Sequence, residues 1–478
     1  MPQIITRFPP SPTGYFHIGS ARTALFNFLF TKKNGGKIFL RFEDTDRERS
    51  KKEYEDDILK SLNWLGINFD PFDGLRVNNK EVLHQSERGK IYEKYLKKMI
   101  EEGSAYLSQE IPKDEEQRSE VVRFKNLNKK IKFNDIIRGE IEFDTTELGD
   151  FVIAKSIHEP LYHLAVVVDD FEMGVTHVIR GEDGISNTPR QILLQETIGA
   201  PRPIYAHIPL ILAPDRSKLS KRHGAVSLNE YKNQGYLPAA MINYLALLGW
   251  NPGTDQEIFN MNELIDLFDL KRVQKSGAIF NIEKLDWINK EHIKRLSTID
   301  LENNVESRIS NFPHFAKATQ GRQFPISKEL LKKITPIIID RINKWSDVDE
   351  MIKSGEIDWV FKEPGTPDDG AHLWTEYKKE NLVWKKLENN SDKFKITQEN
   401  LKEVLVHLEK ISEDDFEENK IKEAIWSFAE EKGRGEVLWP MRYALSGLEK
   451  SPNPFVLAGV LGKKETIKRL KNAVELLN

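Results

Sequence analysis

The chain has 478 residues, of which 39% are hydrophobic and 31% charged, and its formal net charge at pH 7 is −4. This length exceeds one ordinary hydrophobic core, so we expect two to four domains. No apolar run reaches the roughly 20 residues that span a bilayer, and the first residues lack the layout of a secretory signal, so no membrane attachment is expected. The absence of cysteine excludes disulfides, thiolate zinc sites and thiol nucleophiles, and it suits a cytoplasmic protein. The mild negative charge excludes a small basic nucleic-acid binder but allows an enzyme with a local basic face.

Two predicted strands open the chain, with a helix between them. Residues 5–8 (ITRF) are typical of a short buried strand. After Ser20 the apolar residues recur at helical spacing, and Asn34-Gly35-Gly36 ends that helix. The second strand, KIFLRF, begins at Lys37 and places Glu43-Asp44-Thr45-Asp46 at its carboxyl end. A strand, a helix and a strand in this order predict a parallel sheet with a right-handed crossover.

A second helix and a small inserted region follow. Ser50 and Glu53 predict a capping box for a helix that stops at Gly66. Another helix is predicted from about Arg88 to Glu102. The segments after it look strand-like and pair locally, which indicates an inserted α+β domain; they are VVRF, KIKF, EIEF and DFVIAK.

The apolar pattern of a parallel sheet then returns. We predict strands at YHLAVVVDD from Tyr162, at THVIRGED from Thr176 and at PIYAHIPLILA from Pro203. The first of these would end at Asp169-Asp170. A crossover helix begins near Asn187, between the last two strands. We therefore predict one sheet that is interrupted by the insertion and then completed, whereas the chain beyond about residue 230 is predicted to be helical.

Two loops carry the chemical signals. In an open parallel sheet, ligands bind beyond the carboxyl ends of the strands, where both loops fall. In the first loop, prolines hold the backbone, Gly14 and Gly19 allow close approach, and His17 lies at a helix N-terminus that suits phosphate. The second loop, Lys218–Arg222 (KLSKR), carries lysines that could stabilise a triphosphate as it breaks. Taken alone, each loop is better explained without a function, the first as a rigid turn with a surface histidine and the second as a solvated basic loop.

Together the two loops resemble the paired signatures, usually called HIGH and KMSKS, of class I aminoacyl-tRNA synthetases. The resemblance narrows to bacterial-type glutamyl-tRNA synthetases over four long stretches in order, and it continues weakly to the end of the chain. These stretches are RFPPSPTGYFHIGSARTALFNFLF, RFEDTDRERS, YHLAVVVDDFEMGVTHVIRGEDGISNTPRQILL and KLSKRHGAVSL. The HIGH-type motif ends here in Ser20.

The resemblance implies a glutamate pocket. Arg7 and Ser11 of the first loop would bind the amino acid, Glu43 would hold its ammonium, and Tyr162 and Arg180 would complete the pocket. The charges agree, because glutamate has two carboxylates and one ammonium, and arginine grips carboxylates bidentately. The alternative for Glu43 and Arg180 is a structural salt bridge.

The resemblance also implies an ATP site. His17, Lys218 and Lys221 would be catalytic, by positioning and by electrostatic stabilisation of the α-phosphorus transition state and of pyrophosphate. ATP would carry Mg²⁺, and no structural zinc is expected, since the cysteines that bind it in some relatives are absent. The residues expected to contact ATP are Pro10, Thr13, His17, Gly19, Ser20, Lys218, Leu219, Ser220, Lys221 and Arg222.

The fold implied by the resemblance is an α/β catalytic domain with a Rossmann-like parallel sheet, an α+β insertion and an all-α C-terminal region that binds the anticodon. The expected partners are L-glutamate, ATP and tRNA(Glu), with tRNA(Gln) added if the enzyme is non-discriminating, and the enzyme would be a monomer. The expected divisions are a split catalytic domain at 1–87 and 160–230, an acceptor-stem insertion at 88–159, a helical stem-contact domain at 231–325 and the anticodon region at 326–478.

Three alternatives remain from the sequence. A glutaminyl-tRNA synthetase shares the fold, but RFEDTD, KLSKRHG and the helical C-terminal part favour the glutamyl type. A nucleotidylyltransferase shares the phosphate loop but does not need the helical third of the chain. A non-catalytic RNA-binding module would leave Arg7, Glu43 and Arg180 unexplained.

Overall fold

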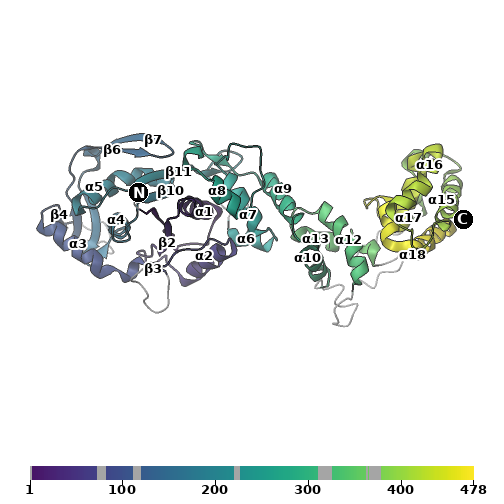
Figure 1. The fold of residues 1–478 in the computed structure, drawn as a ribbon, viewed down its shortest axis with the longest axis horizontal. Coiled ribbons are helices and arrows are strands. Elements are labelled where there is room, and N and C mark those ends of the chain that lie inside the picture. Colours follow the sequence, from purple (N-terminus) through teal and green to yellow (C-terminus); the bar gives the residue numbers. More distant parts are fainter. Residues whose placement is uncertain are drawn as a thin grey trace. The chain divides into compact units, whose positions relative to one another are not determined.

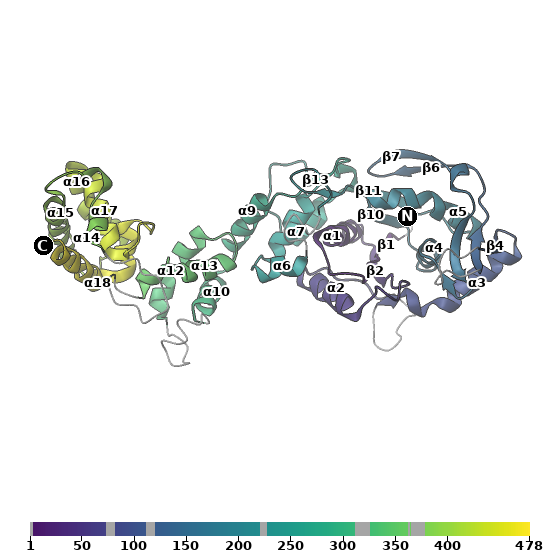
Figure 2. The same cartoon turned by 180° about the vertical axis from the view of Figure 1, so that it is seen from behind.

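The computed structural model describes residues 3–72, 82–110, 120–219, 227–310, 326–361, 364 and 378–478. The chain forms two compact units, Met1–His292 and Ile293–Asn478, which are described separately (Figures 1 and 2). The first unit contains all the described strands, and the second is helical in its described part. None of the described helices is long and apolar enough to cross a membrane.

A parallel sheet lies at the centre of the first unit. Strands β1 (Ile5–Phe8), β2 (Lys37–Phe42) and β3 (Leu83–His84) pair in that order. Strands β10 (His177–Gly181) and β11 (Ile204–Ile208) form the second parallel pair. The Thr176 N–H donates to the Ile5 carbonyl at 2.9 Å, which places β10 beside β1. The predicted sheet, begun before the insertion and completed after it, is therefore confirmed.

Helices cover this sheet and fix the loops at its carboxyl edge. Helix α1 packs against α7 and α8, which explains why so many α1 residues are buried, Arg22 among them. The helices of this unit, apart from those of the inserted region, are α1 (Ile18–Lys33), α2 (Lys52–Trp64), α4 (Tyr162–Glu172), α5 (Thr188–Ile198), α6 (Leu228–Asn233), α7 (Pro238–Leu247), α8 (Met261–Leu267) and α9 (Ile282–Ile293). Two short strands, β12 (Ile211–Leu212) and β13 (Ala278–Ile279), pair in parallel.

The strand predicted from Tyr162 is wrong, because this segment is helix α4. Every residue from Leu164 to Asp170 is buried. A continuous apolar run has no readable period, so it fits a buried helix as well as a buried strand. Asp169 and Asp170 consequently lie within a helix and do not follow a strand.

The predicted capping box is also absent. Helix α2 has Lys51 at its N-cap, with no side-chain capping bond, and the Ser50 hydroxyl is buried with no partner among the described residues. Backbone bonds hold this connection instead: Ser50 N–H donates to the Asp46 carbonyl and Lys51 N–H to the Pro12 carbonyl, both at 3.0 Å. The tertiary contact to the first loop therefore sets where this helix begins.

The inserted region contributes to two sheets. Its helix α3 (Gly89–Glu101) precedes an antiparallel sheet with the order β4-β5-β8-β9. The hairpin of β6 and β7 extends the central sheet instead, because Asp135 of β6 pairs with Tyr205 of β11. The strands are β4 (Ala105–Gln109), β5 (Glu120–Phe124), β6 (Lys130–Asp135), β7 (Gly139–Asp144), β8 (Phe151–Ser156) and β9 (Glu159–Pro160).

The second unit is built around α15, α17 and α18, which share one apolar core with α16. Its described helices are α10 (Thr298–Ser310), α12 (Lys328–Arg341), α13 (Ser346–Lys353), α14 (Lys379–Leu382), α15 (Lys393–Glu409), α16 (Glu418–Lys432), α17 (Arg434–Ser446) and α18 (Pro454–Leu476). The short 3₁₀ helices among the described residues are η1 (Gln85–Glu87), η2 (Thr146–Leu148), η3 (Glu182–Asn187), η5 (Leu270–Arg272), η6 (Asp358–Val360) and η7 (Lys385–Leu387).

Candidate active site

A cavity of 920 Å³ opens at the carboxyl ends of β1, β2 and β10. It receives side chains from the loop between β1 and α1, from the end of β2, from the first residue of α4, from β10 and from the loop after β12. The described residues that line it and that the sequence singled out are Arg7, Pro10, Ser11, Gly14, His17, Gly19, Ser20, Glu43, Tyr162, Arg180, Lys218 and Leu219. A volume in this range suits a small-molecule ligand.

His17 is the N-cap of α1, and Ser20 fixes its ring. The Ser20 N–H donates to His17 Nδ1 at 3.2 Å, and the Ser20 hydroxyl lies 3.0 Å from Nε2. Because Nδ1 accepts, the proton of the neutral ring lies on Nε2. A β-carbon at Gly19 would lie 3.0 Å from His17 Nδ1, so glycine leaves room for the ring. Ser20, which the sequence analysis predicts as an ATP contact, thus orients the histidine.

His17 lines the cavity, and the protein around it lowers the pKa of its ring. Burial lowers the pKa of His17, the nearby Lys218 charge lowers it further, and Asp183 opposes both. A neutral imidazole at the N-terminus of α1 adds no charge of its own, so the helix N–H groups and Lys218 supply the positive field that suits a phosphate.

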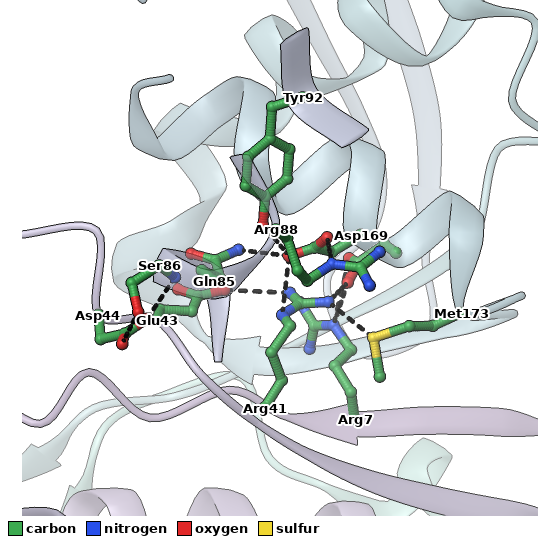
Figure 3. A network of polar contacts seen from close by, with 11 residues as sticks. Arg7, Arg41, Glu43, Asp44, Gln85, Ser86, Arg88, Tyr92, Asp169 and Met173 are labelled. Atoms are coloured by element: carbon green, nitrogen blue, oxygen red, sulfur yellow. Dashed lines mark hydrogen bonds and ion pairs between the residues drawn. The ribbon is translucent and has the colours of Figure 1, made fainter. Parts of the chain in front are cut away.

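Two arginines and two carboxylates form a buried ion-pair network beside the cavity (Figure 3). The Arg7 Nε lies 3.1 Å from Asp170 Oδ1, and Arg41 Nη1 lies 2.8 Å from the same oxygen. Arg41 Nη2 donates to Glu43 Oε1 at 3.0 Å. These four side chains are between 0% and 7% exposed, so each charge depends on its partners rather than on water.

The network shifts the pKa of its members in opposite directions. Burial raises the pKa of Glu43, although the Arg41 and Arg7 charges oppose the rise. For Asp170, burial also acts to raise the pKa, but Arg7 and Arg41 outweigh it and the pKa is lowered. Burial acts to lower the pKa of Arg41, and the carboxylates led by Asp170 outweigh it, so this pKa is raised. Asp170 is therefore the firmly ionised anion of the network, whereas Glu43 is the carboxyl closest to protonation.

Asp169, next to Asp170 in α4, is held by three side-chain hydrogen bonds. Its carboxylate accepts hydrogen bonds from Arg88 Nε at 2.6 Å, Tyr92 Oη at 2.7 Å and Gln85 Nε2 at 2.8 Å (Figure 3). These donors come from η1 and from the start of α3. The segment from η1 into α3 thereby fixes the rotation of α4, and with it the direction of Asp170.

Arg180, on β10, is held at two of its three nitrogens. Its Nε donates to His207 Nε2 at 3.1 Å, and its Nη2 donates to the Gly184 carbonyl at 3.0 Å and to the Thr188 hydroxyl at 2.8 Å. A β-carbon at Gly184 would lie 2.5 Å from Arg180 Nε, so only glycine fits there. The Nη1 atoms of both Arg180 and Arg7 are buried without a hydrogen-bond partner among the described residues.

Known proteins and sequence models match this chain over nearly its whole length. The sequence model of the catalytic domain of class I tRNA synthetases (E and Q) matches residues 3–118 and 109–287, and that of an anticodon binding domain matches 312–474. A glutamate–tRNA ligase of Carboxydothermus hydrogenoformans is 38% identical, with 98% of each chain covered. One of Aquifex aeolicus is 37% identical, with 100% of each covered. The chain belongs to the glutamate–tRNA ligase family.

A solved structure of this family has the same fold as this chain over its whole length. A glutamate tRNA ligase from Elizabethkingia meningosepticum, in complex with its amino acid, has a TM-score of 0.79 and 31% identity, and all of both chains is covered. The predicted α/β catalytic domain and helical C-terminal region are confirmed. Full-length relatives of the glutamate type favour the glutamyl prediction over the glutaminyl and nucleotidylyltransferase alternatives. As an enzyme of a class I synthetase family, the chain uses ATP.

Some predicted ATP contacts fall elsewhere. Ser220, Lys221 and Arg222 lie outside the described residues. Thr13 is exposed and is not among the residues that line the cavity. Its N–H donates to the Ser11 carbonyl at 2.9 Å within a tight turn. An ATP contact by Thr13 therefore gains no support.

The sequence prediction missed charged residues that support the site. Arg41 and Asp170 join Glu43 to Arg7, and Arg22 lines the cavity while donating to the Leu248 carbonyl at 3.0 Å. Burial lowers the pKa of Arg22 to about 10, with Glu182 opposing. A charged residue within an apolar strand or helix is the signal that could have found Arg41 and Arg22.

Proposed function

We propose that this cavity binds L-glutamate through Arg7, Ser11, Glu43, Tyr162 and Arg180. One observation carries the proposal: Arg7 and Arg180, which line the cavity together with Glu43, each keep a buried Nη1 without a hydrogen-bond partner among the described residues. A buried donor without a partner is costly, and a ligand carboxylate would satisfy each one. Two such donors and one buried carboxylate complement the two carboxylates and the ammonium of glutamate.

ATP would bind beside the amino acid, at the N-terminus of α1. His17, Gly19, Ser20 and Pro10 would contact it from the first loop, and Lys218 to Arg222 from the second. ATP would enter as its Mg²⁺ complex, with the ion held chiefly by phosphate oxygens. Within the described residues no group of three or more His, Asp or Glu could hold a metal ion. The protein would position the phosphates through the N-terminus of α1 and the lysines of the second loop.

The reaction would have two steps. A carboxylate oxygen of glutamate attacks the α-phosphorus of ATP, the bond to the β-phosphate breaks, and glutamyl-adenylate and pyrophosphate form. The terminal ribose hydroxyl of tRNA(Glu) then attacks the activated carbonyl and releases AMP. His17, Lys218 and Lys221 would act on the first step by stabilising the charge that develops on the phosphates, with no protein nucleophile.

The tRNA would be bound outside this cavity. The region 88–159 would contact the acceptor stem, 231–325 the stem and 326–478 the anticodon, as the match to an anticodon binding domain supports for the last of these. The split catalytic domain would comprise 1–87 and 160–230. We propose a monomer that works in the cytoplasm, where its substrates ATP and tRNA are found.

ATP–pyrophosphate exchange tests the proposal. Exchange should require glutamate, with tRNA present, and exchange driven by glutamine alone would contradict it. Replacing Arg180 by alanine should raise the KM for glutamate far more than the KM for ATP. Lys221→Ala should chiefly lower kcat of adenylate formation. Aminoacylation of purified tRNA(Glu) and tRNA(Gln) side by side then decides whether tRNA(Gln) is a second substrate.

A further inference from the structure

His207, on β11, lies fully buried between Arg180 and a carboxylate of the inserted region. Its Nε2 is 3.1 Å from Arg180 Nε, and its Nδ1 is 2.7 Å from Asp135 Oδ2. Because the Arg180 Nε always carries hydrogen, Nε2 must accept. The proton of the neutral ring therefore lies on Nδ1, which donates to Asp135. Asp135 thus sets the tautomer that can accept from Arg180.

The hairpin of β6 and β7 holds the backbone of His207 as well. The Asp135 Oδ2 accepts the His207 N–H at 3.0 Å, and Arg138 Nε donates to the His207 carbonyl at 3.2 Å. Arg138 also pairs with Glu182, two residues after Arg180, with 2.5 Å between Nη2 and Oε2. The turn of one hairpin therefore fixes the strand beside Arg180 and the segment that follows it.

Arg180 has little freedom in this arrangement. With Nε bound to His207 and Nη2 bound to Gly184 and Thr188, the guanidinium plane cannot turn without breaking a buried bond. Its Nη1 is left without a described partner. The direction of this remaining donor is consequently set by His207 on one side and by the segment after β10 on the other.

We propose that Asp135 and His207 are positioning residues that set glutamate affinity by orienting Arg180. This inference rests on the proposed role of Arg180 in glutamate binding. Neither residue is among those lining the cavity, so both act through the arginine. The charged or titratable groups that face His207 are Asp135, Arg180, Arg138 and Tyr205. Burial lowers the pKa of His207 against the opposing Asp135 carboxylate, which favours the neutral ring that the geometry requires.

Three substitutions separate positioning from mere packing. His207→Phe keeps a ring but has no acceptor for Arg180. His207→Gln offers a terminal oxygen near the position of Nε2. Asp135→Asn is nearly isosteric, but it removes the charged acceptor of the His207 Nδ1 proton. It also leaves the amide NH2 facing one of the N–H groups that Asp135 now accepts, from His207 or from Ile137 and Arg138. Asp144→Asn is the matched control on β7, because that carboxylate is exposed and bonds locally to Thr146.

Steady-state kinetics of the full chain with purified tRNA(Glu) provides the readout. We expect H207F and D135N to raise the KM for glutamate about tenfold or more, as loss of a hydrogen bond to a charged group implies. The KM for ATP should change less than about twofold, H207Q should recover most of the glutamate affinity, and D144N should match the wild type. Equal effects on both substrates, or no recovery in H207Q, would overturn the proposal.

Two further measurements keep the outcomes distinct. Thermal unfolding of each variant records its folding, and if H207F does not fold, the comparison of D135N, H207Q and D144N decides alone. In an Arg180→Ala background, the effect of H207F on glutamate KM should vanish, and a full additive effect there would contradict action through Arg180. If R180A itself leaves the glutamate KM unchanged, the proposed role of Arg180 fails. If only R180A raises it, this inference fails alone.

Discussion

Arg41 Nη2 lies 3.0 Å from Glu43 Oε1, and these side chains are 0% and 7% exposed. Arg41 reaches Asp170 with its other terminal nitrogen, so a single buried arginine joins the carboxylate at the end of β2 to the one in α4. Arg7 reaches the same Asp170. The two sides of the proposed glutamate pocket are therefore connected through a residue that does not line it.

Replacing Arg41 by methionine should destabilise the first unit by about 3–5 kcal/mol, because buried carboxylates would lose a compensating charge. Chemical denaturation followed through the transition of this unit measures the loss. Arg49→Met is the control, since Arg49 pairs with Asp46 at an exposed position and should change stability little. An equal stability of R41M and wild type would contradict the importance of the network.

The raised pKa of Glu43 predicts a pH dependence of glutamate binding. A raised pKa means that the carboxyl takes up a proton above the usual pH range of a glutamate, and a neutral carboxyl attracts an ammonium less. The kcat/KM for glutamate should therefore fall as the pH is lowered through this pKa. Glu43→Gln should lower kcat/KM on the order of 10- to 100-fold and abolish this fall of kcat/KM at low pH. If the fall at low pH persists in E43Q, it belongs to the titration of another group.

A methyl group at position 19 should disturb the His17 ring. In Gly19→Ala, the new β-carbon would meet Nδ1 at 3.0 Å and Cε1 at 3.1 Å, so the ring must move away from its Ser20 partners. We expect kcat of adenylate formation to fall about 10- to 100-fold in single-turnover experiments. Gly89→Ala is the control, because no atom lies within 4 Å of its added β-carbon. Similar losses in both variants would point to a general glycine effect.

Two substitutions should move the pKa of His17 in opposite directions. Lys218 lowers this pKa and Asp183 raises it. Lys218→Met should therefore shift the titration of His17 upward, and Asp183→Asn should shift it downward. NMR titration of the imidazole resonance, assigned with a His17→Gln variant, measures both. A shift of the same sign in both variants would contradict the charge arrangement at the helix N-terminus.

Much of the architecture was readable from local patterns. The strands before and after α1, the break at Asn34-Gly35-Gly36 and the helical C-terminal part follow from hydrophobic period and glycine position, which act over a few residues. Many of the residues that line the cavity were found through their motifs, and the comparisons then placed the chain in its family.

The failures have a common physical cause. Leu164 to Asp170 is buried on every side, which removes the period that separates helix from strand. Ser50 looked like a cap, but the bond from Lys51 to the Pro12 carbonyl sets the start of α2. In both segments, contacts with distant parts of the chain outweigh local preference.

The sequence by itself determined which charges the chain carries and which loops would hold the chemistry, because these follow from residue type and local pattern. Only the tertiary structure decided how the charges are used. Arg41 bridges Glu43 and Asp170, Ser20 turns His17, and Asp135 reaches Arg180 through His207. Most of these partners are far apart in the chain, and a buried charge takes its function from the neighbours that replace water around it.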